Sequence, residues 1–200
     1  IATAPPMSFF CWFNPDTNPG GLGAALINIE KMPPGFGGTA HFMLGLTSGS
    51  DANPLRVFIR TLGNTSGDAY STDQFSLNTW QSAGGVISSD ASRKAYLNGV
   101  AGTENTTNST LSGLESTLIG VAATSTVGTF TYLFKGCIGY CAAWSIALSD
   151  ADFANLHAGA PPDTIEAASL IMLLPAADVA TAGDNDAGSD FTVTLGTTLA

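Results

Sequence analysis

The segment LNTWQSAGGVISSDASRKAYLNG, residues 77–99, decides the fold of this 200-residue chain. Two runs with strand character, Trp80–Ile87 and Arg93–Asn98, flank the polar turn Ser88-Ser89-Asp90. The pair Asn98-Gly99 predicts a further hairpin, because a type I′ turn needs positive φ at both central residues and Asn-Gly tolerates this best. The segment therefore predicts consecutive antiparallel strands.

A second segment, FKGCIGYCAAWSIALSDADFANLHAG at residues 134–159, predicts a long strand followed by one short helix. Small or apolar residues occupy both faces of Phe130–Ile146, which is typical of a strand buried between two layers. Ser149, with an acidic residue three positions later, predicts a capped helix start. Phe153 and Leu156 form its apolar stripe, and Gly159 predicts its end.

The rest of the chain also has strand character. In Leu55–Thr61, apolar residues alternate with Arg56, Phe58 and Arg60, so these three side chains should share one face of a sheet. Thr103–Gly113, rich in Thr, Asn and Ser, predicts an exposed loop. The other expected strands are Met7–Phe13, Leu22–Ile29, Ala40–Thr47, Thr117–Ala122, Leu170–Leu174 and Phe191–Leu195.

These segments resemble laminin-G-like domains of the concanavalin A type. Such domains typically carry a tryptophan strand, a Tyr-x-Asn-Gly hairpin, and a Gly-x-Ile…Trp strand that ends in a short Leu-Ser-Asp helix. The opening Trp12, Pro15 and Asp16 and the closing Thr-rich strand are similar to the ends of modules from phage proteins. The resemblance covers nearly the whole chain. It implies an all-β, two-sheet antiparallel jelly-roll sandwich with one short helix, forming a single domain over residues 1–200.

Composition limits the partners of this domain. Charged residues make up 11% of the chain, against about 25% in a typical soluble domain, and the net charge is −10. The six cations form no cluster, which argues against nucleic acid, and an acidic chain is repelled by anionic membranes. The longest apolar run, Leu170–Ala177, is too short to span a bilayer, and no secretory signal is visible. We therefore expect a soluble domain.

The three cysteines are expected to be buried free thiols. Cys137 and Cys141 lie four residues apart on the predicted strand, so they should share a face at about 13 Å, too far for a disulfide. Cys11 could meet one of them only across the fold. Free thiols fit a protein assembled in a reducing cytoplasm.

The sequence supports no enzyme. Hydrolases built on this jelly roll usually place two carboxylates on one strand as Glu-x-Asp-x-Glu, because alternate residues project into the same cleft. None of the four glutamates lies in such a motif. His41 and His157 are the only histidines, and there is no Gly-x-Ser-x-Gly nucleophile elbow.

Several residues are candidates for binding a ligand. Arg56 and Arg60 either form a solvated face or, beside Phe58, contact a glycan or a carboxylate on a concave face. Tyr70, expected in a loop, is the best exposed aromatic residue for stacking on sugar. Burial in core strands is expected for the three tryptophans Trp12, Trp80 and Trp144.

Calcium is the only metal that the sequence suggests. Asp184, Asp186 and Asp190 lie in the loop GDNDAGSD, and clustered carboxylates suit a hard cation. The spacing is not that of an EF-hand, and an ordinary Asp/Asn/Gly turn is the alternative. No other cofactor is expected.

The resemblance to phage modules leads to the main functional prediction. It is a non-enzymatic virion structural module, a capsid decoration or tail-associated protein at the virion surface, assembled in the host cytoplasm. Its partners would be other virion proteins in a homo-oligomeric assembly. The alternative is a carbohydrate-binding module that attaches to host or polysaccharide glycans, with or without calcium. A divergent hydrolase is a third possibility that lacks its carboxylate pair.

Overall fold

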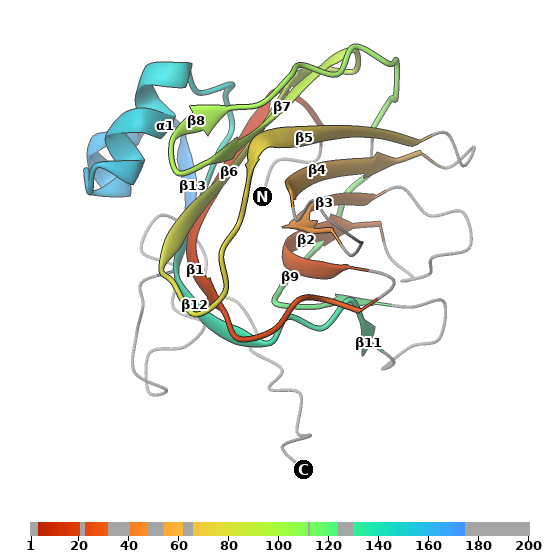
Figure 1. The fold of residues 1–200 in the computed structure, drawn as a ribbon. Helices are drawn as coiled ribbons and strands as arrows, with labels where there is room; N and C mark the ends of the chain where they lie inside the picture. The colour runs from red at the N-terminus through yellow and green to blue at the C-terminus, as the bar shows by residue number, and fades with distance from the viewer. Residues whose placement is uncertain are drawn as a thin grey trace.

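The computed structural model of the chain describes residues 4–20, 23–31, 41–47, 54–61, 66–111, 113–123 and 130–174. Two antiparallel sheets pack face to face, and one helix lies outside them (Figure 1). The six-stranded sheet comprises, in spatial order, β13 (Leu170–Leu174), β12 (Gly136–Trp144), β1 (Met7–Pro15), β6 (Gln81–Ser89), β7 (Ser92–Leu97) and β8 (Val100–Ala101).

The five-stranded sheet comprises, in spatial order, β5 (Ser66–Gln74), β4 (Pro54–Arg60), β3 (His41–Leu46), β2 (Ala24–Glu30) and β9 (Ser116–Ile119). A small ribbon pairs β10 (Ala122–Ala123) with β11 (Phe130–Thr131). The helix α1 (Asp150–His157) follows β12, and the short 3₁₀ turns η1 (Pro162–Thr164) and η2 (Ala167–Ser169) lead into β13. The all-β, two-sheet expectation with one short helix is confirmed.

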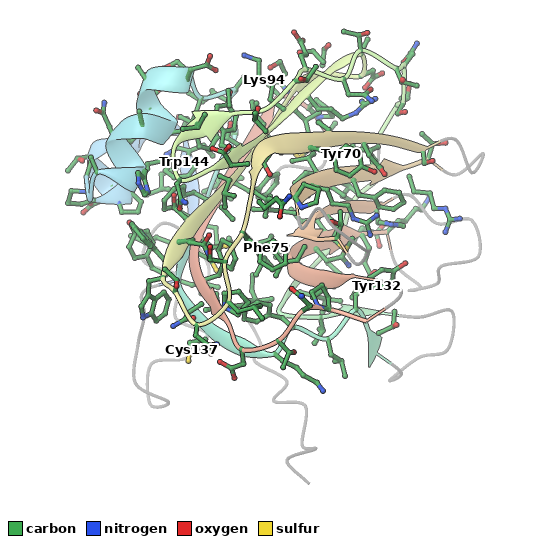
Figure 2. All side chains as sticks on the ribbon, in the orientation of Figure 1. Tyr70, Phe75, Lys94, Tyr132, Cys137 and Trp144 are labelled. Atoms are coloured by element: carbon green, nitrogen blue, oxygen red, sulfur yellow. The ribbon has the colours of Figure 1, made fainter. Side chains whose placement is uncertain are left out.

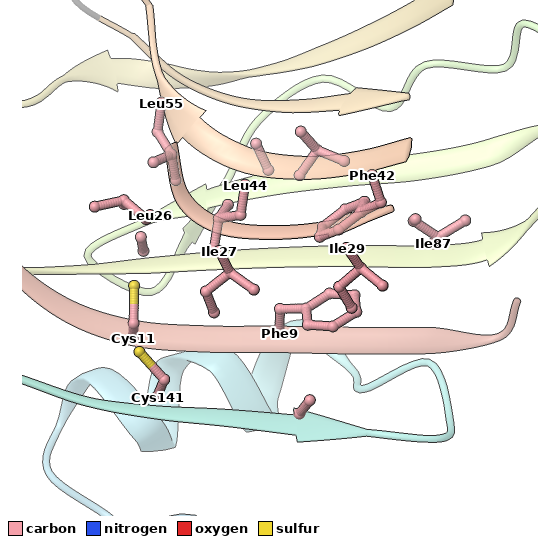
Figure 3. Packing of buried hydrophobic residues seen from close by; sticks show 14 of the residues in the cluster. Phe9, Cys11, Leu26, Ile27, Ile29, Phe42, Leu44, Leu55, Ile87 and Cys141 are labelled. Atoms are coloured by element: carbon pink, nitrogen blue, oxygen red, sulfur yellow. The ribbon is translucent and has the colours of Figure 1, made fainter. Parts of the chain in front are cut away.

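The main core fills the space between the two sheets. Alternate residues of each strand face inward, so one apolar face of each layer is removed from water (Figure 3). The rings of Phe9 on β1 and Phe42 on β3 stack with centroids 4.4 Å apart, which joins the two layers directly. Other members shown in Figure 3 are Cys11, Leu26, Ile27, Ile29, Leu44, Leu55, Ile87 and Cys141.

A second apolar cluster lies on the outer face of the six-stranded sheet, beneath α1. Tyr96 and Phe153 stack with centroids 3.9 Å apart, and the Trp144 indole donates a 2.7 Å hydrogen bond to the Ile165 carbonyl oxygen. Gly84 permits this docking, because a Cβ there would lie 2.6 Å from the Phe153 ring. The helix therefore covers one end of this sheet face.

The cap of α1 and the turn after β7 follow the sequence prediction. Ser149 accepts from the Asp152 backbone N–H while the Asp152 carboxylate accepts from the Ser149 backbone, which forms a capping box. Asn98 and Gly99 have φ values of 52° and 77°, as the type I′ hairpin between β7 and β8 requires. Both predictions are confirmed.

The expectation for the cysteines is wrong in part, and a β-bulge explains it. Cys11 pairs with Cys141 across β1 and β12, but Phe13 pairs with Ile138, so two residues of β12 oppose one of β1. The extra residue puts Cys137 and Cys141 on opposite faces of the sheet. Cys11 and Cys141 are buried neighbours in the core, whereas Cys137 is exposed; all three are free.

Tyr70 lies in a strand and not in the loop that was expected. The segment SGDAYSTDQ of β5 alternates buried and exposed positions, but its buried side chains are small, such as Ala69 and Ser71. The strong apolar signal of a core strand is therefore missing from the sequence. The predicted strand Phe191–Leu195 lies outside the described residues. None of the helices in the described segments has the length and apolar character needed to cross a bilayer.

Candidate functional site

The outer face of the five-stranded sheet brings together two of the three predicted ligand-binding residues. Arg56 on β4 is the direct cross-strand partner of Tyr70 on β5, and Phe58 is the partner of Asp68. The inward-facing neighbours of β4 are fully buried, so its alternation places the guanidinium and the ring on the outer face as predicted. Directly opposite residues in antiparallel strands have Cβ atoms about 5 Å apart, which allows contact.

Arg56, Asp68 and Tyr70 form a connected cluster, here called the β4–β5 cluster. The Tyr70 hydroxyl donates to Asp68 Oδ2 at 2.8 Å, and Arg56 Nη1 lies 4.0 Å from the same oxygen. The Arg56 guanidinium also lies over the Phe58 ring, 5.0 Å from its centroid, in a cation–π arrangement. The three side chains are thus held in fixed relative positions.

The exposure of the cluster is graded. Tyr70 is 43% exposed, while the side chains of Arg56 and Asp68 are 16% and 24% exposed. Burial raises the pKa of Tyr70, and the neighbouring Asp68 carboxylate raises it further, so the phenol stays protonated and donates at neutral pH. Asp68 Oδ1 is buried and accepts no hydrogen bond within the described part of the chain. The cluster thus offers a donor-rich guanidinium beside a carboxylate and an exposed ring.

Arg60 lies apart from this cluster. It is four residues along β4 from Arg56, which is about 13 Å at strand rise, and its cross-strand partner is His41. His41 in turn pairs with Glu30, and Asn28 donates to Glu30 Oε2 at 3.0 Å. His41, Glu30 and Asn28 are buried polar residues. This row shares the outer face and meets the cluster at Phe58, whose ring centroid lies 5.0 Å from that of His41, but it lies away from the accessible edge where Tyr70 is.

Sequence reasoning missed the residue that ties the neighbouring loop to β5. Arg93 on β7 is fully buried and donates to Asn105 Oδ1 at 3.0 Å, to the Thr107 carbonyl oxygen and to the Asp90 carbonyl oxygen at 3.3 Å. Asn105 then donates at 2.8 Å to the backbone oxygen of Asp68. An arginine in a strand carries no sequence signal of burial, so only the structure identifies this support of the site.

The tryptophans divide into buried and accessible side chains. Trp144 is fully buried beneath α1, as predicted, but Trp12 is only partly buried and Trp80 is 50% exposed. The expectation for Trp80 is wrong because β6 begins one residue later, at Gln81, which leaves the indole beyond the end of the sheet. Figure 2 shows Tyr70 on β5 and Cys137 on β12, which belong to different sheets.

The predicted calcium ligands Asp184, Asp186 and Asp190 lie outside the described residues. Within the described ranges, no three His, Cys, Asp or Glu side chains gather closely enough to hold a metal ion. The calcium assignment therefore stays a prediction.

Comparison with known proteins identifies the family of the fold. A family model, Laminin_G_3, described as the concanavalin A-like lectin/glucanases superfamily, matches residues 3–154. The chain belongs to this superfamily. The laminin-G-like, concanavalin A-like jelly roll expected from the sequence is thereby confirmed. A search of curated proteins finds no match.

Solved structures share this superfamily fold at low sequence identity. A heptameric SAP-like pentraxin from Limulus polyphemus has a TM-score of 0.60 and 14% identity, covering 78% of this chain and 73% of its own. Domain 4 of AbnA, a GH43 extracellular arabinanase from Geobacillus stearothermophilus, was solved with arabinotriose; it has a TM-score of 0.59 and 16% identity over 78% and 68%.

A further similar structure is the CBM40 domain of the Ruminococcus gnavus IT-sialidase bound to α2,3-sialyllactose. It has a TM-score of 0.61 and 13% identity, covering 78% of this chain and 84% of its own. Identity at this level shows a shared fold only. One fold can serve several functions, so the ligand of this chain depends on the residues of its own surface.

Proposed function

We propose that this chain is a carbohydrate-binding module whose β4–β5 cluster contacts the glycan. The observation that carries the proposal is the connected arrangement of Arg56, Asp68 and Tyr70 at the accessible edge of the five-stranded sheet. The structural neighbours that were solved with arabinotriose or sialyllactose support carbohydrate binding as the role of the domain.

The chemistry of the cluster suits a sugar. A pyranose or furanose ring has a face of C–H groups and a rim of hydroxyls. A site that binds it therefore needs an apolar ring that covers the C–H face, and donors and acceptors in fixed positions that hydrogen-bond to the hydroxyls. Tyr70 supplies an exposed ring, Arg56 supplies several N–H donors, and the partly exposed Asp68 carboxylate supplies an acceptor oxygen, Oδ2. Because the guanidinium and carboxylate are already paired, little side-chain entropy is lost on binding.

The same face does not favour hydrolysis. Glu30 on β2 and Asp68 on β5 have their carboxylates on this face, and two other strands lie between them. Three strand spacings of about 4.8 Å separate their backbones by about 14 Å. Glycosidase carboxyl pairs lie about 5–9.5 Å apart. We therefore propose binding without catalysis.

The virion assignment stays a prediction. It depends on similarity to phage modules at the two ends of the chain, and the comparisons add no support to it. Homo-oligomers on a virion and a glycan-binding role are compatible, so the two are tested separately. Co-purification with capsid or tail subunits would support the virion role, and their absence would argue against it.

A glycan array tests the proposed function directly. The purified chain should bind a defined subset of glycans, and Tyr70→Ala and Arg56→Ala should each weaken binding about tenfold, the equivalent of about 1.4 kcal/mol. Leu133→Ala, which truncates an exposed side chain that is 57% accessible, serves as the control and should bind as the wild type does.

The array is run with calcium and again with chelator. If binding is lost on chelation, the site includes a metal ion. If binding survives chelation, the side chains of the β4–β5 cluster contact the glycan without a metal ion. An array that is silent in both conditions would refute the carbohydrate-binding function.

A further inference from the structure

Four aromatic residues gather on the outer face of the six-stranded sheet, beyond the end of α1. They are Trp12 on β1, Trp80 just before β6, Tyr140 on β12 and His157 at the last turn of the helix. The helix covers the other end of this sheet face, so the four residues, here called the aromatic cluster, lie where the helix stops. The cluster is on the opposite sheet from the β4–β5 cluster.

The contacts within the cluster hold its rings in place. Trp12 Nε1 donates to the Tyr140 hydroxyl oxygen at 3.0 Å, and the Trp12 and His157 rings stack with centroids 5.7 Å apart and planes 24° apart. Ser82 Oγ lies 3.0 Å from His157 Nδ1, which fixes the imidazole from the sheet side. Phe10 supports the cluster from the helix side, 6.4 Å from the Trp12 ring and 6.0 Å from the Tyr140 ring.

A backbone irregularity in β12 lies beside Trp12 and Trp80. Gly139 and Tyr140 are the two residues of β12 that oppose Trp12 at the bulge. A Cβ on Gly139 would lie 3.0 Å from Trp12 Cβ and 3.5 Å from Trp80 Cζ3. The backbone of β12 therefore passes close to Trp12 and to the Trp80 ring, and the bulge turns Tyr140 to the same face as Trp12.

Three polar atoms of the cluster have no partner among the described residues. These are the Trp80 indole N–H, the proton of the Tyr140 hydroxyl and His157 Nε2. Burial raises the pKa of Tyr140, although the hydrogen bond from Trp12 lowers it, so the hydroxyl keeps its proton at neutral pH. An accessible aromatic surface thus carries unpaired hydrogen-bonding groups at its edges.

We propose that the aromatic cluster is a second carbohydrate site, which stacks the C–H face of a neutral pyranose on Trp80 and hydrogen-bonds its hydroxyls at the rim. The proposal rests on the carbohydrate-binding function but assigns it to the other sheet. A neutral sugar is favoured because the contacts that hold the cluster join indole, phenol and imidazole rings, whereas the β4–β5 cluster presents an arginine and a carboxylate.

The size of the surface favours a sugar ring over a protein partner. Trp80 is 50% exposed, and the other three residues are partly buried. A large aromatic side chain has about 150–250 Å² of surface, so the accessible area of the four residues is no more than about 400 Å². A stable protein interface needs about 800 Å² on each partner. One or two sugar rings fit this area.

The test uses cellohexaose and mannohexaose, two neutral pyranose oligosaccharides, as probes. Titration of the full chain should change tryptophan fluorescence, with affinity also measured by calorimetry. Trp80→Ala should weaken binding of the bound probe at least tenfold, and Trp80→Phe, which keeps a ring, should retain part of the affinity. Leu133→Ala is the matched control, because it removes an exposed apolar side chain elsewhere. Unfolding curves verify that each variant folds.

The outcomes separate this proposal from the proposed function. Binding that Trp80→Ala abolishes and Tyr70→Ala leaves unchanged supports the second site. Binding that only Tyr70→Ala weakens overturns the second site and leaves the proposed function standing. Failure of both probes to bind also overturns the neutral-pyranose assignment, whatever the glycan array shows. Sedimentation velocity completes the test: a dimer that Trp80→Ala dissociates would make this face a protein interface.

Discussion

Replacement of Arg93 by Met should destabilise the domain more than any surface charge change. The guanidinium donates three hydrogen bonds to the loop segment and turn around it, and hydrogen bonds from charged groups contribute about 1.5–3 kcal/mol each. The Arg93 Nε is buried and has no partner in the described part of the chain, and its desolvation costs about 1–3 kcal/mol of the stabilisation from these hydrogen bonds. The three bonds less this penalty give about 1.5–8 kcal/mol. Because a single substitution rarely costs more than about 4–5 kcal/mol, we expect a net loss of about 3 kcal/mol in the free energy of unfolding.

Lys135→Met is the matched control for this substitution. Lys135 is exposed, so its removal changes the net charge equally but should alter stability by no more than about 0.5 kcal/mol. Urea unfolding followed by tryptophan fluorescence measures both variants. Arg93→Met should also speed amide exchange at Asn105, whose backbone N–H donates to the Arg93 carbonyl oxygen. A difference between the two variants below about 1 kcal/mol would refute the claim that Arg93 anchors the loop.

Three further predictions test the packing and the titrating groups. Gly84→Ala should cost about 1–3 kcal/mol because its Cβ would meet a ring of α1, while Gly20→Ala, with open space around it, should be near neutral in urea unfolding. Ellman's reagent should modify one thiol, Cys137, in the native chain and all three in denaturant. A hydrogen bond from Tyr96 lowers the pKa of Asp150, so the ionised carboxylate stabilises the fold above about pH 4, and this stabilisation is lost as the pH falls through the lowered pKa. In the Asp150→Asn variant, the free energy of unfolding should therefore depend less on pH in acid than it does in the wild type.

The fold could be read from the sequence because its strongest signals are local. Three local patterns each favour one low-energy structure, and each structure forms as predicted: the alternation in Leu55–Thr61, the Asn98-Gly99 pair and the Ser149 cap. Strand β5 has no such signal. Its inward positions are filled by Gly, Ala and Ser, and the strand forms because β4 offers it a hydrogen-bonding edge.

The candidate site was predicted in part. Alternation alone places Arg56 on an outer sheet face, and Tyr70 was identified as exposed. Their meeting, however, depends on the register between β4 and β5, which is set by tertiary pairing that no residue spacing encodes. Asp68, which joins the two, therefore could not be assigned to the site from the sequence, although it stands two residues before Tyr70.

The bulge in β12 shows why the second surface escaped prediction. A regular strand would turn Ile138, Tyr140 and Trp144 to one face, and that period-2 pattern is what the sequence displays. In the structure, Ile138 packs into the core while Tyr140 faces outward, because one extra residue is inserted opposite Trp12. A single inserted residue therefore exposes the Cys137 thiol and places the Tyr140 phenol beside the Trp12 indole. Gly139 is the position to vary, because a Cβ there would lie 3.0 Å from Trp12 Cβ and in contact with the Trp80 ring, so a side chain larger than alanine would press on the aromatic cluster.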